Sequence, residues 1–269
     1  MEIRPDDPGA NFVIETIVRD PKWSMPYLHY HDSYELYFLE KGTHNTLIGD
    51  TLLSLNEQDV ALYKPNVLHK SHNTKGYTRT CIYFTQDYLE MYFSARAIRT
   101  LTKCFEKLVI SLDKETFMNI RKKFPLIKNE KPEQENNLIF AYLSEILTTL
   151  GKNMNAFSPV KLSPEQERMT AVLQHINKNY NTIDNIEEIA DKFYITKYHL
   201  CRIFKASTGL TLIEYINHIK IQHACEMLKS TKKSITQIGM DCGFNSSMYF
   251  CKTFQKIIHM SPGEYRRMQ

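Results

Sequence analysis

Three histidines and a glutamate near the start of the chain have the types and spacing of a ligand-binding or metal-binding set. One residue separates His29 from His31, Glu35 follows four residues later, and His69 comes after a Pro65-Asn66 turn. Alternate residues of a β-strand point to the same side, so His29 and His31 can face one interior together. Imidazole and carboxylate groups suit zinc, iron, nickel or manganese, and they also hydrogen-bond hydroxylated ligands. Three hypotheses stay open: an effector pocket, a metal site, or a structural hydrogen-bond cluster.

Tyrosines close to this set extend it into a candidate effector pocket. A tyrosine offers a ring that stacks on a ligand and a hydroxyl that hydrogen-bonds to it. The candidate pocket comprises Tyr27, His29, His31, Glu35, Tyr37, His69 and Tyr83. We expect His44 and His72 to be surface residues. No cofactor is predicted, and a metal is the alternative at the His29, His31, Glu35 and His69 cluster.

Short strands must position these side chains. Apolar and polar residues alternate through most of the segment from Phe12 to Phe84, and Gly49-Asp50 between two β-prone runs indicates a hairpin. Turn signals recur every 8–12 residues. This pattern predicts a small antiparallel barrel or sandwich.

After Asp87 the apolar period becomes helical. Leu138, Tyr142, Ile146 and Leu150 form one stripe. Such faces can cover the barrel, pair with another subunit, or do both. Residues 151–164 contain two prolines and a glycine and are predicted to be a linker.

Charge and composition narrow the class of protein. Residues 1–160 hold 19 Lys and Arg against 20 Asp and Glu, whereas residues 161–269 hold 15 against 10. A basic segment beside a neutral one points to an anionic partner for that half, most commonly nucleic acid. No apolar run is long enough to span a membrane, and the acidic N-terminus does not resemble a secretory signal. We therefore expect a cytoplasmic protein whose six cysteines, none in a CxxC pair, are reduced.

Two helix-turn-helix units are predicted in the last hundred residues. Thr196 and Ser234 are positioned as helix caps, and Gly243 supplies a turn. The expected helices are 185–193 and 197–208 in the first unit, 212–229 as the connection, 235–242 in the second unit, and a last helix capped by Asn245 or Ser246 that ends near Ile258.

This arrangement suits double-stranded DNA. The second helix of each unit fits the major groove, and two units on one connecting helix reach neighbouring grooves about 34 Å apart. Arg202 has the chemistry to bind guanine with two hydrogen bonds, and Lys252 occupies the corresponding place in the second unit.

Residues 165–267 resemble the DNA-binding domain of the AraC/XylS family of bacterial transcription regulators. The resemblance is carried by residues 186–217 and 224–267, and above all by Ile238-Gly239, Cys242-Gly243-Phe244, Tyr249-Phe250, Phe254, Ser261-Pro262 and Tyr265-Arg266. The HxHx3Ex6G stretch from His29 to Gly42 is similar to the first motif of the cupin superfamily, whose barrels often hold a divalent metal. The second motif, around His69, lacks the usual glycine.

The AraC/XylS resemblance implies DNA contacts from two recognition helices. These contacts fall on Tyr198, Cys201, Arg202 and Lys205 in the first helix, and on Ser247, Met248, Cys251 and Lys252 in the second. Phosphate contact is the alternative role for Arg202 and Lys252, and packing against a neighbouring helix is the alternative for Tyr198 and Met248. Because Cys201, Met248 and Cys251 are less polar than typical base readers, we expect the second helix to contribute apolar contacts.

The sequence thus predicts a multidomain α+β protein, with an N-terminal cupin-like antiparallel β-barrel, trailing helices and a C-terminal all-α double helix-turn-helix domain. The expected divisions are an effector-sensing barrel at 1–86, a helical dimerisation segment at 87–150, a linker at 151–164 and the DNA-binding domain at 165–269. We predict a transcription regulator and no enzyme. Its expected partners are promoter DNA, a small effector such as a sugar, a second copy of the chain, and RNA polymerase if it is an activator. The alternative is a metal-dependent cupin enzyme with an accessory helical domain.

Overall fold

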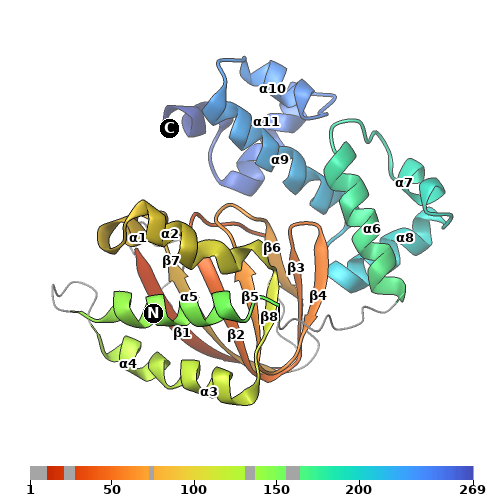
Figure 1. Cartoon of the computed structure of the whole chain (residues 1–269). Coiled ribbons are helices and arrows are strands. Elements are labelled where there is room, and N and C mark those ends of the chain that lie inside the picture. The colour runs from red at the N-terminus through yellow and green to blue at the C-terminus, as the bar shows by residue number, and fades with distance from the viewer. Residues whose placement is uncertain (1–10, 21–27, 73–75, 131–136, 156–163, 269) are drawn as a thin grey trace. The chain divides into compact units, whose positions relative to one another are not determined.

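The computed structural model of the chain describes residues 11–20, 28–72, 76–130, 137–155 and 164–268 (Figure 1). The chain forms two compact units, one built from Met1–Gly49 and Leu53–Leu162 and the other containing Ser163–Gln269. The first unit combines β-strands with helices, and the elements described in residues 164–268 are all helices. Tyr27 of the candidate pocket and most of the expected linker lie outside the described residues.

The strands of the first unit form two antiparallel sheets. A five-stranded sheet has the order β1-β7-β2-β5-β8, and a three-stranded sheet has the order β4-β3-β6. Gly49 and Asp50 form the β3–β4 turn, which confirms the hairpin expected from the sequence. The strands are β1 (Phe12–Arg19), β2 (Tyr34–Gly42), β3 (His44–Ile48), β4 (Thr51–Leu55), β5 (Asp59–Tyr63), β6 (His69–His72), β7 (Tyr77–Phe84) and β8 (Val109–Ser111).

Alternation along the strands separates two chemically different faces of the large sheet. In β2, Leu36 and Phe38 belong to the apolar cluster that includes the helices, while Tyr37 and Leu39 join a second cluster with residues of β3 and β4. The second cluster therefore lies between the two sheets. The register places Glu35 opposite both Tyr63 of β5 and Tyr83 of β7, so Glu35 also faces this interior.

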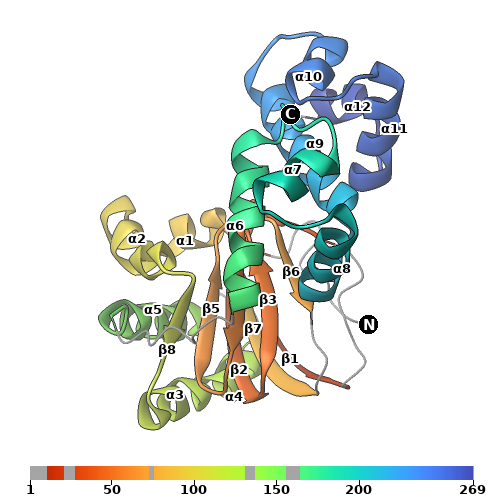
Figure 2. The same cartoon turned by 90° about the vertical axis from the view of Figure 1, so that its right-hand side faces the viewer.

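Five α-helices and a short 3₁₀ helix cover the outer face of the five-stranded sheet (Figure 2). Their bounds are α1 (Gln86–Tyr92), α2 (Ala95–Leu101), η1 (Thr102–Glu106), α3 (Lys114–Arg121), α4 (Lys123–Asn129) and α5 (Ile139–Lys152). Helix α5 buries Ile139, Leu143, Ile146, Leu147 and Leu150. The buried face of α5 is therefore rotated relative to the stripe of Leu138, Tyr142, Ile146 and Leu150 that the sequence predicted. Leu138 precedes the helix and is 48% exposed.

The second unit contains seven α-helices among its described residues. They are α6 (Pro164–Asn179), α7 (Ile186–Lys192), α8 (Lys197–Thr208), α9 (Leu212–Ser230), α10 (Ile235–Asp241), α11 (Ser247–Ile258) and α12 (Pro262–Arg267). Helices α7 and α8 form the first helix-turn-helix, and α10 and α11 form the second. The long helix α9 runs between the two pairs (Figure 1). This confirms the predicted fold of a β-rich domain followed by a double helix-turn-helix.

Side-chain caps set the starts of these helices as the sequence predicted. Thr196 accepts a hydrogen bond from the backbone N–H of His199, Ser234 from that of Gln237, and Ser246 from that of Tyr249. Ser246 is thus the cap that the sequence left open between two residues. Tyr249 of α11 is 48% exposed, and its hydroxyl accepts a hydrogen bond from Asn217 of α9.

The sequence predicted neither a membrane-spanning segment nor disulfide bonds. Among the described residues, no helix combines the length and apolar character that a bilayer crossing requires. All six cysteines are free thiols.

Substitution of Gly243 tests how the second helix-turn-helix is closed. Gly243 has φ +77°, and a Cβ there would lie 2.5 Å from the carbonyl oxygen of Asn181. We expect Gly243→Ala to destabilise the second unit by about 1–3 kcal/mol, measured by calorimetry. The matched control is Gly263→Ala, whose Cβ would make ordinary contacts at 3.6 Å or more. Equal unfolding temperatures for the two variants would contradict this account of the turn.

Candidate functional site

A buried carboxylate is the centre of the polar interior between the sheets. Glu35 Oε2 lies 3.2 Å from His31 Nε2 and 3.6 Å from His69 Nε2. His29 pairs with His69 through an isolated β-bridge, and the two imidazole centroids are 4.2 Å apart. The strands thus bring together the four residues that the sequence singled out.

Backbone contacts fix the orientation of two of the imidazoles. His31 Nδ1 lies 2.9 Å from the carbonyl oxygen of Ser33, and His69 Nδ1 lies 2.8 Å from that of Val67. A carbonyl oxygen only accepts, so each Nδ1 carries the hydrogen and donates it. In a neutral ring the Nε2 lone pair then faces Glu35. Two lone pairs against a carboxylate require a positive charge between them, either a proton on one ring or a bound cation.

The other oxygen of Glu35 contacts a second group of side chains. Cys81 Sγ donates to Oε1 at 3.1 Å, and Arg79 Nη1 lies 3.7 Å from the same atom. Arg79 also pairs with Glu15 at 3.3 Å and sits over the ring of Tyr37. Since Arg79 is 7% exposed, its charge is held almost entirely by protein groups.

These surroundings set the protonation states. Burial raises the pKa of Glu35, but the hydrogen bond from His31 and the nearby charges, including Arg79, outweigh it, so the pKa lies well below the usual range. Burial, together with the neighbouring imidazoles, lowers the pKa of His69 well below 6.5. Glu35 is therefore ionised at neutral pH, whereas His69 resists protonation.

Two further members of the candidate pocket line the same interior. Tyr37 and Tyr83 are both buried, and the Tyr83 ring packs edge-on against His31 at 5.6 Å. Arg79, Cys81 and Glu15 also belong to this interior but were not among the residues predicted from the sequence. Arg79 and Cys81 share the strand parity of Tyr83, so strict alternation along 77–84 would have found them.

The expectation that His44 is a surface residue is wrong. His44 is fully buried, because it shares the inward parity of Thr46 on β3, and its ring stacks on Tyr37 with centroids 4.7 Å apart. Thr46 in turn bonds the hydroxyl of Tyr63 across the interior at 3.1 Å. The side chain of His72 lies outside the described residues.

The donor set also has the spacing of a metal site. The imidazole nitrogens of His29, His31 and His69 lie within 4.8 Å of one another. Ligand atoms about 2.1 Å from a tetrahedral ion are roughly 3.4 Å apart, close to the separations between Glu35 Oε2 and the two Nε2 atoms. Backbone acceptors on Nδ1 are also the usual second layer around metal-bound imidazoles. His31, His69 and Glu35 therefore have the spacing of ligands to a divalent transition metal, and His29 lies close enough to be a further candidate ligand.

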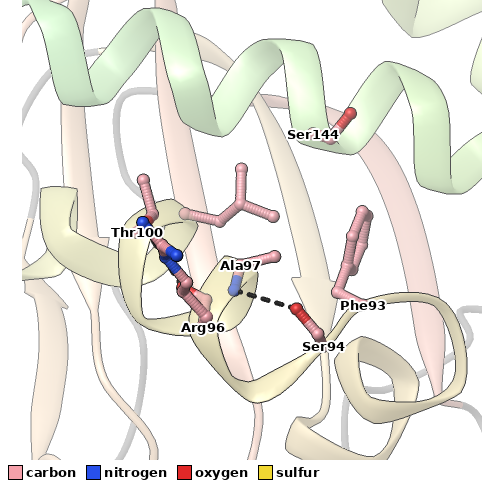
Figure 3. A pocket seen from close by; sticks show the side chains of 7 residues that line it. Phe93, Ser94, Arg96, Ala97, Thr100 and Ser144 are labelled. Carbon is pink, nitrogen blue, oxygen red and sulfur yellow. Dashed lines mark hydrogen bonds between the residues drawn. The ribbon is translucent and has the colours of Figure 1, made fainter.

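A separate hollow of about 430 Å³ lies in the helical layer (Figure 3). Its lining is Phe93, Ser94, Arg96, Ala97, Thr100, Leu101 and Ser144. Phe93, in the α1–α2 loop, and Ser144, on α5, both border it. None of the candidate effector residues that the structure describes contributes to it.

The second unit presents two helices with exposed, largely polar faces. On α8, Tyr198, Arg202 and Lys205 are exposed, and Cys201 is half-buried among them. On α11, Ser247, Met248 and Lys252 are exposed, and Cys251 is half-buried. Tyr198 and Met248 are 80% and 83% exposed, so neither packs against a neighbouring helix. His199 accepts a hydrogen bond from Arg202 at 3.2 Å and orients the guanidinium.

An internal repeat identifies one residue that the sequence argument missed. Thr196 and Ser246 cap the two helices at an offset of 50 residues, and Gly209 and His259 end them at the same offset. Tyr198, Cys201 and Arg202 thus correspond to Met248, Cys251 and Lys252. By the same offset Lys205 corresponds to Gln255, which is exposed on α11.

Contacts from α9 hold the second turn in place. The buried Lys220 donates to the carbonyl oxygen of Gly243 at 2.6 Å and lies over the Phe244 ring. Burial lowers the pKa of Lys220. At the other end of the unit, Asn177 of α6 bonds the hydroxyl of Tyr215 on α9 at 2.6 Å. Phe204 of α8 packs against the same Tyr215, with ring centroids 5.6 Å apart, so α9 contacts both helix-turn-helix pairs.

Comparisons with known proteins agree with this architecture. The family described as AraC-like ligand binding domain matches residues 12–134, and the family described as helix-turn-helix domain matches residues 189–268. An uncharacterised HTH-type transcriptional regulator, YfiF of Bacillus subtilis (strain 168), is 29% identical over 252 residues, which cover 90% of this chain and 79% of YfiF.

Two further relatives are also regulators. The HTH-type transcriptional activator RhaS of Escherichia coli O157:H7 (strain EC4115 / EHEC) is 22% identical, over 97% of this chain and 94% of RhaS. The lactose operon transcription activator of Staphylococcus xylosus is 29% identical over 51% of this chain and 49% of its own length.

A β-rich ligand-binding domain followed by a double helix-turn-helix defines a ligand-controlled DNA-binding transcription regulator. The chain belongs to the AraC family of these regulators. Both matching families are regulatory, which confirms the prediction of a regulator and not an enzyme.

Burial of His69 makes the first unit less stable in acid. The folded-state pKa lies below 6.5, while the unfolded chain takes up a proton near pH 6.5, so stability falls as the pH drops through 6.5. We expect His69→Gln to lose about 1 kcal/mol less unfolding free energy than wild type between pH 7.5 and 5.5. Urea unfolding followed by far-UV circular dichroism at both pH values measures this. Identical pH slopes for wild type and variant would refute the assignment.

Proposed function

We propose that the chain recognises promoter DNA through the exposed faces of α8 and α11. The single observation that supports this most directly is the matched pair of exposed faces, Tyr198-Cys201-Arg202-Lys205 on one helix and Met248-Cys251-Lys252 on the other, with Ser247 at the start of the second. Arg202 and Lys252 occupy equivalent positions and supply the hydrogen-bond donors that suit guanine or phosphate. The excess of basic residues beyond 160 favours the same partner.

In this proposal the first unit senses a small polar effector, and a sugar is the candidate. The effector contacts the interior formed by His29, His31, Glu35, Tyr37, His69 and Tyr83, with Tyr27 as a further candidate. Buried donors and acceptors beside aromatic rings suit a hydroxylated ligand. The lactose operon activator among the relatives carries a sugar in its name, which favours the same class.

We assign the remaining parts of the chain roles that agree with DNA binding by the second unit and effector binding by the first. Residues 1–86 form the sensor, 87–150 mediate homodimerisation, 151–164 link the parts, and 165–269 bind DNA in the cytoplasm. The exposed Leu138 and the hollow beside Ser144 support a contact between copies through the helical layer. If the protein is an activator, RNA polymerase is a further partner.

Removal of Arg202 tests the DNA-binding assignment. Arg202→Ala should weaken binding to the selected site by about 1–3 kcal/mol, because a guanine or phosphate contact is lost. The site is first obtained by enriching fragmented genomic DNA with the full-length protein, and affinity is then measured by fluorescence anisotropy. Lys178→Ala removes the same charge from α6 and serves as the control. Wild-type affinity in Arg202→Ala would show that the α8 assignment is wrong.

Substitution of Glu35 tests the effector site. A panel of mono- and disaccharides, together with Zn²⁺, Mn²⁺ and Ni²⁺, is screened by thermal shift of the full chain. We expect one sugar to raise the unfolding temperature of wild type and of Glu106→Gln, an exposed control, but not that of Glu35→Gln. A rise with an ion alone would support the metal hypothesis instead, and no rise with any sugar would contradict the proposal.

A further inference from the structure

The turn of the first helix-turn-helix contains a residue in an unusual conformation. Tyr194 has φ +55°, in the left-handed region that glycine favours. Its side chain is 95% exposed. The ring therefore makes almost no packing contact within the unit. Packing thus does not explain why a tyrosine occupies this position.

The second helix-turn-helix has the same turn with glycine in this position. Tyr194 N–H donates to Asp191 O and Ile195 N–H donates to Ala190 O; forty-nine residues later, Gly243 N–H donates to Met240 O and Phe244 N–H to Gly239 O. Both turns end a helix with the left-handed residue at the position where glycine is the common choice. Tyr194 and Gly243 are therefore equivalent, and the chain uses the conformationally unfavourable residue in only one of the two turns.

The two positions differ in what surrounds them. A Cβ on Gly243 would collide with the carbonyl oxygen of Asn181. At Tyr194 the side chain extends into solvent. Tyr194, Met248 and Tyr198 are the three most exposed large apolar side chains among the described residues. Met248 and Tyr198 are on the recognition helices, and Tyr194 lies two residues before the cap of α8.

We propose that Tyr194 contacts the DNA backbone beside the groove that α8 enters. The inference rests on the proposed function, because it requires α8 to meet DNA by its N-terminal half. A side chain just before such a helix lies at the edge of the groove, next to phosphate and sugar. The tyrosine hydroxyl donates to a phosphate oxygen, and the ring packs on the sugar. The backbone strain at Tyr194 is thus retained for binding and not for folding.

This role separates the effect on folding from the effect on binding. Tyr194→Gly suits the left-handed conformation, so we expect an unfolding temperature equal to or above that of wild type. The same variant should bind DNA roughly 3- to 10-fold more weakly, on the selected site and on a scrambled duplex alike. Tyr194→Phe keeps the ring and loses the hydroxyl, so its affinity should lie between the two.

Salt dependence distinguishes this contact from those of the basic residues. A neutral hydroxyl displaces no counterion from DNA, so the slope of log affinity against log salt should be unchanged in Tyr194→Gly. Lys205→Ala should lower the magnitude of the slope by about one. Affinities of the full-length proteins for both 30-base-pair duplexes are measured by fluorescence anisotropy from 50 to 200 mM salt.

The outcomes separate this inference from the proposed function. Weaker binding by Tyr194→Gly with an unchanged slope and undiminished thermal stability supports the inference. If Arg202→Ala weakens binding and Tyr194→Gly binds like wild type, the inference fails and the proposed function stands. If neither substitution changes binding, both fail. A lowered unfolding temperature in Tyr194→Gly overturns the inference as well, because the ring would then serve folding.

Discussion

A carboxylate removed from water must be surrounded by donors and positive charge, and the interior of the first unit is built around this requirement at Glu35. One oxygen faces two imidazoles at 3.2 and 3.6 Å, and the other faces Cys81 and Arg79. These groups come from β2, β6, β7 and the segment before β2. Satisfying a single side chain therefore fixes the relative positions of the two sheets, and any ligand that enters must compete with or complete this network.

The two faces of the large sheet differ in chemistry. Its outer face presents apolar residues such as Leu36, Phe38 and Ile82, which α1–α5 remove from water. Its inner face carries the polar groups around Glu35, which bond to one another. The two-residue period of the strands thus divides one sheet into an apolar face covered by helices and a face that borders the polar interior.

Local signals were sufficient to predict most of the helical unit. Capping residues such as Thr196 and Ser234 and the left-handed Gly243 locate the helix ends because they act within a few residues of the chain. The β3–β4 hairpin was found for the same reason. The interior of the sheets was predicted only in part. Alternation along β7 shows that Arg79 shares the face of Tyr83, but its partner Glu35 lies on β2, 44 residues away in sequence, and no local pattern states which strands pair or in which register. His44 was misplaced because a lone histidine near a strand end gives no sign of which sheet covers it.

The two helix-turn-helix units show how a repeated structure acquires different constraints. Their caps, turns and helix ends correspond when one unit is shifted by 49 or 50 residues along the chain. The two units therefore have the same backbone conformation at these positions. In the second, Gly243 fits against Asn181 and its carbonyl is held by Lys220, so close packing determines the residue. In the first, the equivalent position is open to solvent, and packing imposes no choice of side chain. A tyrosine is unfavourable in the left-handed conformation, so it is tolerated only where close packing does not require glycine. Of these two turns, the first meets this condition, and Tyr194 occupies it.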